Sequence, residues 1–260
     1  MKKILITGAN SYIGTSFEKY INENHPNDYT IDTVDMIDGS WRSKSFAGYD
    51  AVFHVAGIAH QKETKENAHL YYEVNRDLAV ETAKKAKNDG VRQFIFLSSM
   101  SVYGLNTGVI TKDTVPNPKS NYGKSKWEAE KKISELGTTS FCISILRPPM
   151  VYGDGCKGNY QTIVKIVKKF PVFPKVNNQR SMVKIETLLS FIEKLIINRE
   201  SGIFFPQEKN YIKTDDLAIE IACNINKKLY CSYLLGWIVI CCRPFSVTLQ
   251  KAFGSLIYKL

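Results

Sequence analysis

Short apolar and β-branched runs alternate with helical patterns along the first part of the chain. Five such runs predict strands at 3–7, 29–35, 51–55, 92–98 and 140–146. Helical spacing of apolar residues between them predicts helices at 12–24, 64–88 and 121–137. This alternation calls for a parallel sheet with helices on both faces. The pattern therefore predicts an α/β fold with a Rossmann-type doubly wound parallel sheet.

After residue 147 the pattern loosens, and Pro and Gly residues punctuate the chain. Short helices are predicted at 159–169, 186–198 and 214–226. Loops carried by a rigid domain commonly form a binding lobe. We expect a first domain at residues 1–150, joined by elements that return from the C-terminal part, and a small C-terminal lobe at residues 151–260.

Residues 229–242 are nearly all apolar and are flanked by Lys227, Lys228 and Arg243. The segment is shorter than the about 20 residues that span a bilayer. We expect it to form a packed helix or strand of the C-terminal lobe. Contact with a membrane surface and a spanning segment are the weaker alternatives.

The charge and the cysteine spacing of the chain indicate which kinds of partner and which cellular compartment to expect. The 260 residues include 35 basic and 25 acidic side chains, and the net charge of +10 favours an anionic ligand or surface. The lysines are scattered in pairs and no run interleaves Arg with aromatic residues, so no nucleic-acid partner is expected. The six cysteines form no C-x-x-C pattern, which predicts neither a metal site nor a disulfide scaffold. A reducing, cytoplasmic compartment fits best.

A turn motif follows the first predicted strand, Thr7-Gly8-Ala-Asn-Ser11-Tyr12-Ile13-Gly14. Gly8 permits a tight turn, Gly14 allows close helix packing, and the helix N-terminus offers free N–H groups to a pyrophosphate. Ser11 stands where the usual fingerprint has its middle glycine. The motif alone fits an ordinary strand-to-helix turn equally well, but its position after the first strand favours dinucleotide binding.

Asp35 ends the second predicted strand, where an acidic side chain can accept from both ribose hydroxyls and repel a 2′-phosphate. This favours NAD over NADP. An exposed end-of-strand Asp is the plain alternative, and Arg42 or Lys44 could still accommodate a phosphate. The small residues Val55, Ala56 and Gly57 end the third strand and would lie beside the adenosine.

Tyr122 and Lys126 are four residues apart and lie on the same face of a predicted helix. A phenol has a pKa near 10, so it serves as a base at neutral pH only if positive charge favours the phenolate. Lys126 and the positively charged nicotinamide ring would together supply that charge. The plain alternative is an exposed Tyr and Lys on an amphipathic helix.

Six motifs occur in a fixed order over about residues 2–220: Thr7-Gly8…Ser11…Gly14, 50–57, Val74-Asn75, 96–104, Tyr122…Lys126 and 146–153. In order and spacing they resemble the extended short-chain dehydrogenase/reductases of the NAD-dependent epimerase/dehydratase family, which act on nucleotide sugars. The resemblance implies an NAD(P)-binding domain at 1–150 and a substrate-binding lobe at 151–260 that is shortened at its C-terminus. A shortened lobe would impair the enzyme or leave a tail that pairs with another subunit.

The resemblance also implies residue roles. Ser99, Tyr122 and Lys126 would be the catalytic triad, in which Ser99 hydrogen-bonds the phenol and Lys126 reaches the nicotinamide ribose. Implied cofactor contacts are Gly8, Ser11, Tyr12, Ile13, Gly14, Asp35, Val55, Ala56, Gly57, Asn75, Tyr122, Lys126 and Pro149. Implied substrate contacts are Ser99, Ser101, Tyr122, Asn159 and Arg180, with Arg180 on the diphosphate. No metal is implied.

Within the family, 4,6-dehydratases carry Asp-Glu where this chain has Met100-Ser101, so dehydration is disfavoured. The segments 151–159 and 180–183 resemble those of 4-keto-6-deoxy-N-acetylhexosamine reductases and related epimerases. We expect C4 inversion of a UDP-hexose or UDP-N-acetylhexosamine through a 4-keto intermediate, by an enzyme that holds NAD and forms a homodimer. The alternatives are an NAD(P)H-dependent 4-reductase of a UDP-4-keto-6-deoxy-hexosamine and a non-catalytic dinucleotide-binding protein.

Overall fold

The computed structural model describes residues 1–59, 61 and 63–259, and the chain divides into two compact units. Unit 1 comprises Met1–Gly104, Pro116–Pro148 and Ile185–Pro206. Unit 2 comprises Leu105–Val115, Pro149–Lys184 and Gln207–Leu260. The chain thus enters unit 2 three times, at Leu105, at Pro149 and at Gln207, and residues 185–206 return to unit 1.

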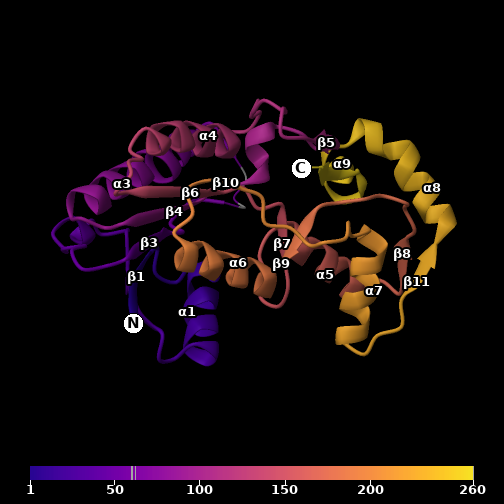
Figure 1. Cartoon of the computed structure of the whole chain (residues 1–260). Helices are drawn as coiled ribbons and strands as arrows, with labels where there is room; N and C mark the ends of the chain where they lie inside the picture. Colours follow the sequence, from indigo (N-terminus) through magenta and orange to yellow (C-terminus); the bar gives the residue numbers. More distant parts are fainter. Residues whose placement is uncertain (60, 62, 260) are drawn as a thin grey trace. The chain divides into compact units, whose positions relative to one another are not determined.

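Unit 1 is built on a sheet of six parallel strands (Figure 1). In spatial order these are β10 (Gly202–Phe204), β6 (Cys142–Leu146), β4 (Gln93–Leu97), β3 (Ala51–His54), β1 (Lys2–Thr7) and β2 (Tyr29–Val34). Each neighbouring pair is parallel. The strand order reverses between β1 and β3, and such a reversal opens a crevice at the carboxyl ends of the strands. The predicted parallel sheet is confirmed.

Helices cover both faces of this sheet, as Figure 1 shows. Helices α1 (Tyr12–Asn24) and α6 (Ile185–Asn198) contact each other on one face, and α3 (Leu78–Asn88) and α4 (Asn121–Ser134) do so on the other. Helix α1 buries Phe17 and Ile21, four residues apart. The ring of Phe17 meets that of Phe53 edge-on at 5.4 Å, which fastens the helix to β3.

The predicted single helix at 64–88 is wrong in its extent and continuity. The chain forms α2 (Ala68–Tyr72), a π-helical turn η2 (Glu73–Asp77) and then α3. π-Helical turns are rare and frequently occur at functional sites. This one carries the fully buried Asn75.

Unit 2 consists of short elements. Its strands pair two by two: β7 (Met150–Tyr152) with β9 (Met182–Lys184), β8 (Val172–Pro174) with β11 (Tyr230–Ser232), and β5 (Gly108–Ile110) with β12 (Leu256–Tyr258). Its helices are α5 (Asn159–Lys169), α7 (Thr214–Asn224), α8 (Tyr233–Cys242) and α9 (Val247–Phe253). The core gathers around Phe173, which joins Val167 of α5, Ile221 of α7 and Phe253 of α9.

The apolar segment at 229–242 forms β11 and α8, and it packs against unit 2 along one side only. Leu229 and Val239 pack against the core around Phe173. Gly236 is buried, and the backbone of Lys175 passes so close that a Cβ at Gly236 would lie 1.9 Å from its carbonyl oxygen. The side chains of Tyr233, Leu234 and Trp237 remain exposed. No helix in the described part of the chain is long and apolar enough to cross a membrane.

Candidate active site

The turn between β1 and α1 requires glycine at both of its ends. Gly8 has φ +114°, and a Cβ there would lie 2.6 Å from the backbone nitrogen of Ala56. A Cβ at Gly14 would lie 2.5 Å from Ser11 Oγ and 3.0 Å from Val55 Cγ2. The backbone therefore approaches closely on both sides of the turn, as a phosphate cradle needs.

Ser11 is the N-cap of α1, and its Oγ accepts from the backbone N–H of Gly14 at 3.2 Å. A hydroxyl that accepts one hydrogen bond can still donate its own hydrogen, so Ser11 remains able to bind a phosphate oxygen. The first turn of α1, which begins with Tyr12 and Ile13, contains no acidic residue. Its free N–H groups and helix dipole favour an anion.

Asp35 follows β2 with an exposed carboxylate. Its Oδ1 accepts from the backbone N–H of Ile37 at 3.0 Å, which fixes the orientation of the carboxylate. Arg42, a sequence candidate for binding a 2′-phosphate, forms a two-pronged ion pair with Glu81 at 2.5 and 2.7 Å. This pairing weakens the case for NADP and supports NAD.

The end of β3 lies against α4 through Gly57. A Cβ at Gly57 would lie 2.8 Å from Asn75 Oδ1 and 3.3 Å from Lys126 Nζ. Asn75 holds this loop from the π turn: it exchanges hydrogen bonds of 2.8 and 3.0 Å with the backbone of Ile58. Its Nδ2 also donates to Ser125 Oγ on α4 at 3.3 Å. Asn75 therefore connects two parts of the site by hydrogen bonds. One is the loop after β3, which was predicted to lie beside the adenosine, and the other is α4, which carries Tyr122.

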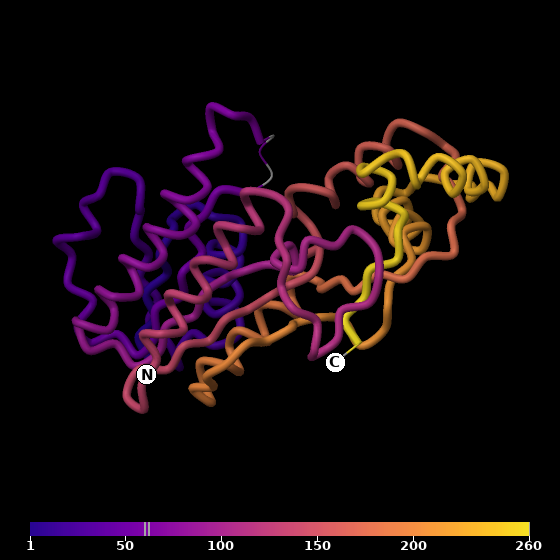
Figure 2. Tube along the Cα trace, turned by 90° about the horizontal axis from the view of Figure 1, so that it is seen from above, coloured from indigo at the N-terminus to yellow at the C-terminus, as the bar shows by residue number. Residues whose placement is uncertain are grey.

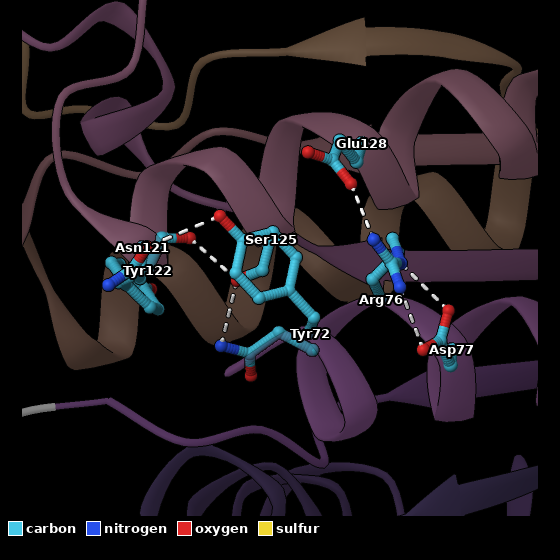
Figure 3. A network of polar contacts seen from close by, with 8 residues as sticks. Tyr72, Arg76, Asp77, Asn121, Tyr122, Ser125 and Glu128 are labelled. Atoms are coloured by element: carbon cyan, nitrogen blue, oxygen red, sulfur yellow. Dashed lines mark hydrogen bonds and ion pairs between the residues drawn. The ribbon is translucent and has the colours of Figure 1, made fainter. Parts of the chain in front are cut away.

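Polar contacts along α2 and η2 fasten this segment to α4 (Figure 3). The hydroxyl of Tyr72 donates to Asn121 Oδ1 at 3.2 Å. Arg76 donates to Glu128 and to Asp77, each at 2.7 Å. The N-terminal half of α4 is thus held along its length.

The three predicted triad residues come together in unit 1. Ser99 follows β4, while Tyr122 and Lys126 occupy successive turns of α4. The Ser99 hydroxyl lies close enough to the Tyr122 phenol to lower its pKa. Ser99 Oγ accepts from the backbone N–H of Ser101 and donates to Ser101 Oγ, both at 3.1 Å. The structure therefore brings Ser101 to the predicted catalytic residues as well.

Lys126 alone does not lower the pKa of Tyr122. Burial raises the pKa of Tyr122, and the Ser99 hydroxyl opposes that rise only in part. Lys126 turns its ammonium elsewhere: Nζ donates to the carbonyl oxygen of Leu97 at 2.9 Å and lies 4.7 Å from the centre of the Phe96 ring. Activation of the phenol therefore needs positive charge in addition to that of Lys126.

Lys126 is itself only 5% exposed. This burial lowers its pKa to about 8, while the carboxylate of Glu130 acts in the opposite direction. The Lys126 ammonium therefore loses its proton at a pH much closer to neutral than an ordinary lysine does.

Sequence reasoning missed a buried ion-pair network directly behind Lys126. Arg147 donates to the Glu130 carboxylate from Nη2 at 2.6 Å and from Nε at 3.1 Å. Its Nη1 donates to the Tyr103 hydroxyl oxygen at 2.7 Å. Ser98 donates to the same Glu130 carboxylate. The available signal was the charge of Arg147 at the end of an apolar strand, because a buried charge needs a partner.

Three residues that were predicted to contact cofactor or substrate belong to unit 2. Pro149 is buried, and Asn159 is exposed at the start of α5. Arg180 is only 7% exposed. Arg180 Nη1 donates to the carbonyl oxygen of Gly254 at 2.6 Å, and its Nε has no hydrogen-bond partner. Burial lowers the pKa of Arg180 to about 10, and it forms no ion pair with the described residues. A buried guanidinium with unused donors suits an anionic ligand.

Known proteins resemble the chain over most of its length. The model of the "NAD dependent epimerase/dehydratase family" matches residues 4–171. A UDP-glucose 4-epimerase of Vibrio cholerae is 32% identical over an alignment of 286 positions, gaps included, that covers 99% of this chain and 83% of that protein. An N-acetyl-alpha-D-glucosaminyl-diphospho-ditrans,octacis-undecaprenol 4-epimerase of Escherichia coli O157:H7 is 26% identical, with coverage of 87% and 73%.

Solved structures share the fold. A dTDP-4-dehydrorhamnose reductase from Bacillus anthracis in complex with NADP has a TM-score of 0.74 at 20% identity, covering 99% of this chain and 90% of that one. A UDP-glucuronic acid 4-epimerase from Bacillus cereus in complex with NAD has a TM-score of 0.71 at 20% identity, covering 88% and 85%. At this level of identity the likeness establishes the architecture.

Proposed function

The chain belongs to the NAD-dependent epimerase/dehydratase family, and from that premise we propose that it inverts C4 of a UDP-linked hexose or N-acetylhexosamine through a 4-keto intermediate. The observation that carries the proposal is the grouping of three side chains: the Ser99 hydroxyl acts on the Tyr122 phenol and lowers its pKa, and the buried Lys126 lies one turn further along the helix of Tyr122. These groups stand at the carboxyl ends of the strands, the edge at which sheets of this kind bind ligands.

In the proposed reaction Tyr122, as phenolate, removes the proton of the C4 hydroxyl while the C4 hydrogen leaves as hydride. Gly8, Gly14 and Asp35 would hold NAD, which when bound would supply a reversible hydride acceptor and a positive charge that favours the phenolate. Ser99 holds the phenolic and substrate oxygens in line. After the keto sugar presents its other face, Tyr122 returns the proton to the C4 oxygen, so no net oxidation results.

The cofactor cradle fits this proposal. Gly8 and Gly14 leave room for the backbone to approach a pyrophosphate, and the first turn of α1 carries no acidic side chain. Asp35 offers a carboxylate for ribose hydroxyls, and the pairing of Arg42 with Glu81 weighs against a 2′-phosphate.

Arg180 is the proposed diphosphate ligand, because its buried guanidinium has unused donors. We propose Asn159 for the base and Ser101 for the sugar, by their match to the family motifs. The homodimer and the cytoplasmic location remain predictions, which gel filtration and cell fractionation would test.

The second candidate is NAD(P)H-dependent reduction of a UDP-4-keto-6-deoxy-hexosamine. It is favoured by the fold shared with the dTDP-4-dehydrorhamnose reductase, since the same triad serves a single hydride transfer. A reductase consumes one NAD(P)H for each product formed, whereas an epimerase consumes none. A dinucleotide-binding protein without turnover is the third candidate, and the assembled triad argues against it.

The test is proton NMR of UDP-glucose, UDP-N-acetylglucosamine and their polyprenyl-diphosphate counterpart after incubation with the protein and NAD. Formation of the C4 epimer from one of these substrates, without change in the NAD pool, supports the proposal. Consumption of NADH with a 4-keto substrate, and no epimer from any of the three, would favour the reductase. Including the lipid-linked sugar is warranted by the substrate named for the Escherichia coli relative.

A further inference from the structure

Helix α8 presents large apolar side chains to the outside of unit 2. We define the α8 face as Tyr230, Tyr233, Leu234, Trp237, Ile240 and Phe245. Tyr233 is 74% exposed, Trp237 64% and Phe245 90%. In both views α8 lies along the outer edge of its unit (Figures 1 and 2). Contiguous apolar surface of this kind marks an interaction site in a folded protein.

Basic residues predominate in the segments that carry the α8 face. The two segments that build this part of unit 2, residues 156–184 and 221–259, contain twelve Lys and Arg and no Asp or Glu. The positive excess of the whole chain, +10, therefore resides here, because the remaining residues are slightly acidic. The acidic side chains nearest along the chain are Asp154, Glu186 and Glu220, and in space Asp215 and Asp216 of α7 act on Cys231 of β11.

Basic and aromatic groups also meet in space. The β8–β11 ladder sets Tyr230 opposite Val172, and Lys175 Nζ lies 4.7 Å from the centre of the Tyr233 ring. Lys169 Nζ lies 5.4 Å from the ring of Phe170, which immediately precedes this ladder. Tyr and Trp rings bordered by lysines are typical of surfaces that meet lipid headgroups.

We propose that the α8 face docks this protein on the surface of a bilayer that contains anionic phospholipids. The helix has ten residues and, at 1.5 Å per residue, is about 15 Å long, half of the hydrocarbon core, so it lies on the membrane and does not cross it. The apolar side chains would enter the headgroup boundary, and the lysines would meet lipid phosphates.

The positive charge near the α8 face favours an anionic bilayer over a second copy of the chain as its partner. A two-fold dimer through the α8 face would bring the two basic regions together, and their repulsion would oppose association. An anionic surface attracts the same lysines. The inference stands on α8 and its charges alone and does not depend on the catalytic proposal.

Flotation of the full-length chain with vesicles tests the proposal. We expect binding to phosphatidylcholine vesicles with about a third phosphatidylglycerol, little binding to pure phosphatidylcholine, and weakening in 0.5 M NaCl. The double variant L234S/W237S should bind at least tenfold more weakly, and Lys175→Gln should weaken binding to the anionic vesicles alone. The control Ile197→Ser removes an exposed apolar side chain of α6 and should bind like wild type.

A spectroscopic readout separates docking from misfolding. Trp41 is buried, whereas Trp237 is exposed, so docking should shift Trp fluorescence to the blue and reduce acrylamide quenching, and Trp237→Phe should abolish this response. Equal vesicle binding by wild type and L234S/W237S would overturn the proposal, as would no binding by wild type. A dimer that dissociates in L234S/W237S without any vesicle binding would also overturn it, and would assign the face to a second copy.

Discussion

The ammonium nitrogen of Lys126 lies 2.9 Å from the carbonyl oxygen of Leu97, two residues before Ser99. One hydrogen bond thus joins the helix that carries Tyr122 to the strand end that carries Ser99. It also places a cation in a buried setting, where its pKa falls to about 8 from an ordinary 10.5. The proposed triad therefore includes a lysine whose pKa is well below its ordinary value.

Lys126→Met should change how stability depends on pH. Between pH 8 and 10.5 the unfolded chain keeps Lys126 protonated while the folded chain loses the proton. The unfolded state then binds more protons, so this lysine makes the free energy of unfolding rise with pH, by up to about 3 kcal/mol. Urea unfolding at pH 7.5, 9 and 10 should show a rise in wild type that is smaller in the variant. Parallel curves for the two proteins would refute the burial of a charged Lys126.

Tyr122→Phe should lower turnover by about a thousandfold and leave NAD affinity within a few-fold, because only the proton-transfer group is lost. The matched control is Tyr72→Phe, which removes a hydroxyl that donates to Asn121 on the same helix. It should keep turnover within about threefold. Comparable activity of the two variants would remove Tyr122 from the mechanism.

Glu130→Gln should cost about 3–5 kcal/mol of unfolding free energy, because it leaves the buried Arg147 without its carboxylate. Glu128→Gln is the matched control on the same helix. Its partly exposed pair with Arg76 should contribute less than about 1 kcal/mol. Chemical denaturation of both variants at pH 7 measures the difference, and equal losses would contradict a structural role for the buried network.

Asp35→Ser should raise the ratio of NADP affinity to NAD affinity about tenfold or more, since the carboxylate that repels a 2′-phosphate is removed. Asp38→Ser, in the following loop, serves as the control: Asp38 accepts from Ser40 and should leave the ratio unchanged. Isothermal titration with both dinucleotides measures the ratio. A ratio that shifts equally in both variants would place the ribose contact elsewhere.

Much of the fold could be predicted from local pattern. The strands and helices of unit 1 have long periodic segments, and the Tyr122–Lys126 spacing fixes one helical face wherever a helix forms. The π turn at Asn75 could not be predicted, because it depends on hydrogen bonds to Ile58 and Ser125, which are distant in sequence.

The helices α5 and α7 of unit 2 were predicted, but its short strands and the strand β10 of unit 1 were not. A strand of three residues is too short to show an alternation of apolar and polar side chains. The strand β10 is defined by its pairing with β6, which is distant in sequence. The effect of Lys126 on the pKa of Tyr122 could not be predicted either, because it depends on a contact between elements that are distant in sequence. Sequence spacing gives the distance along a helix, but the carbonyl of Leu97, which comes from another element, decides where the Lys126 ammonium points.

The most direct test of the proposed epimerase uses a UDP-hexose, or the diphosphate-linked sugar that NMR identifies as substrate, with deuterium at C4. Mass spectrometry and NMR of the product, together with the NAD content of the protein, follow the hydride. The account predicts a C4 epimer that keeps its deuterium at C4, with no net consumption of coenzyme, because the same hydride leaves and returns. An epimer that has lost the deuterium to solvent, or a product formed with one equivalent of coenzyme consumed, would contradict it.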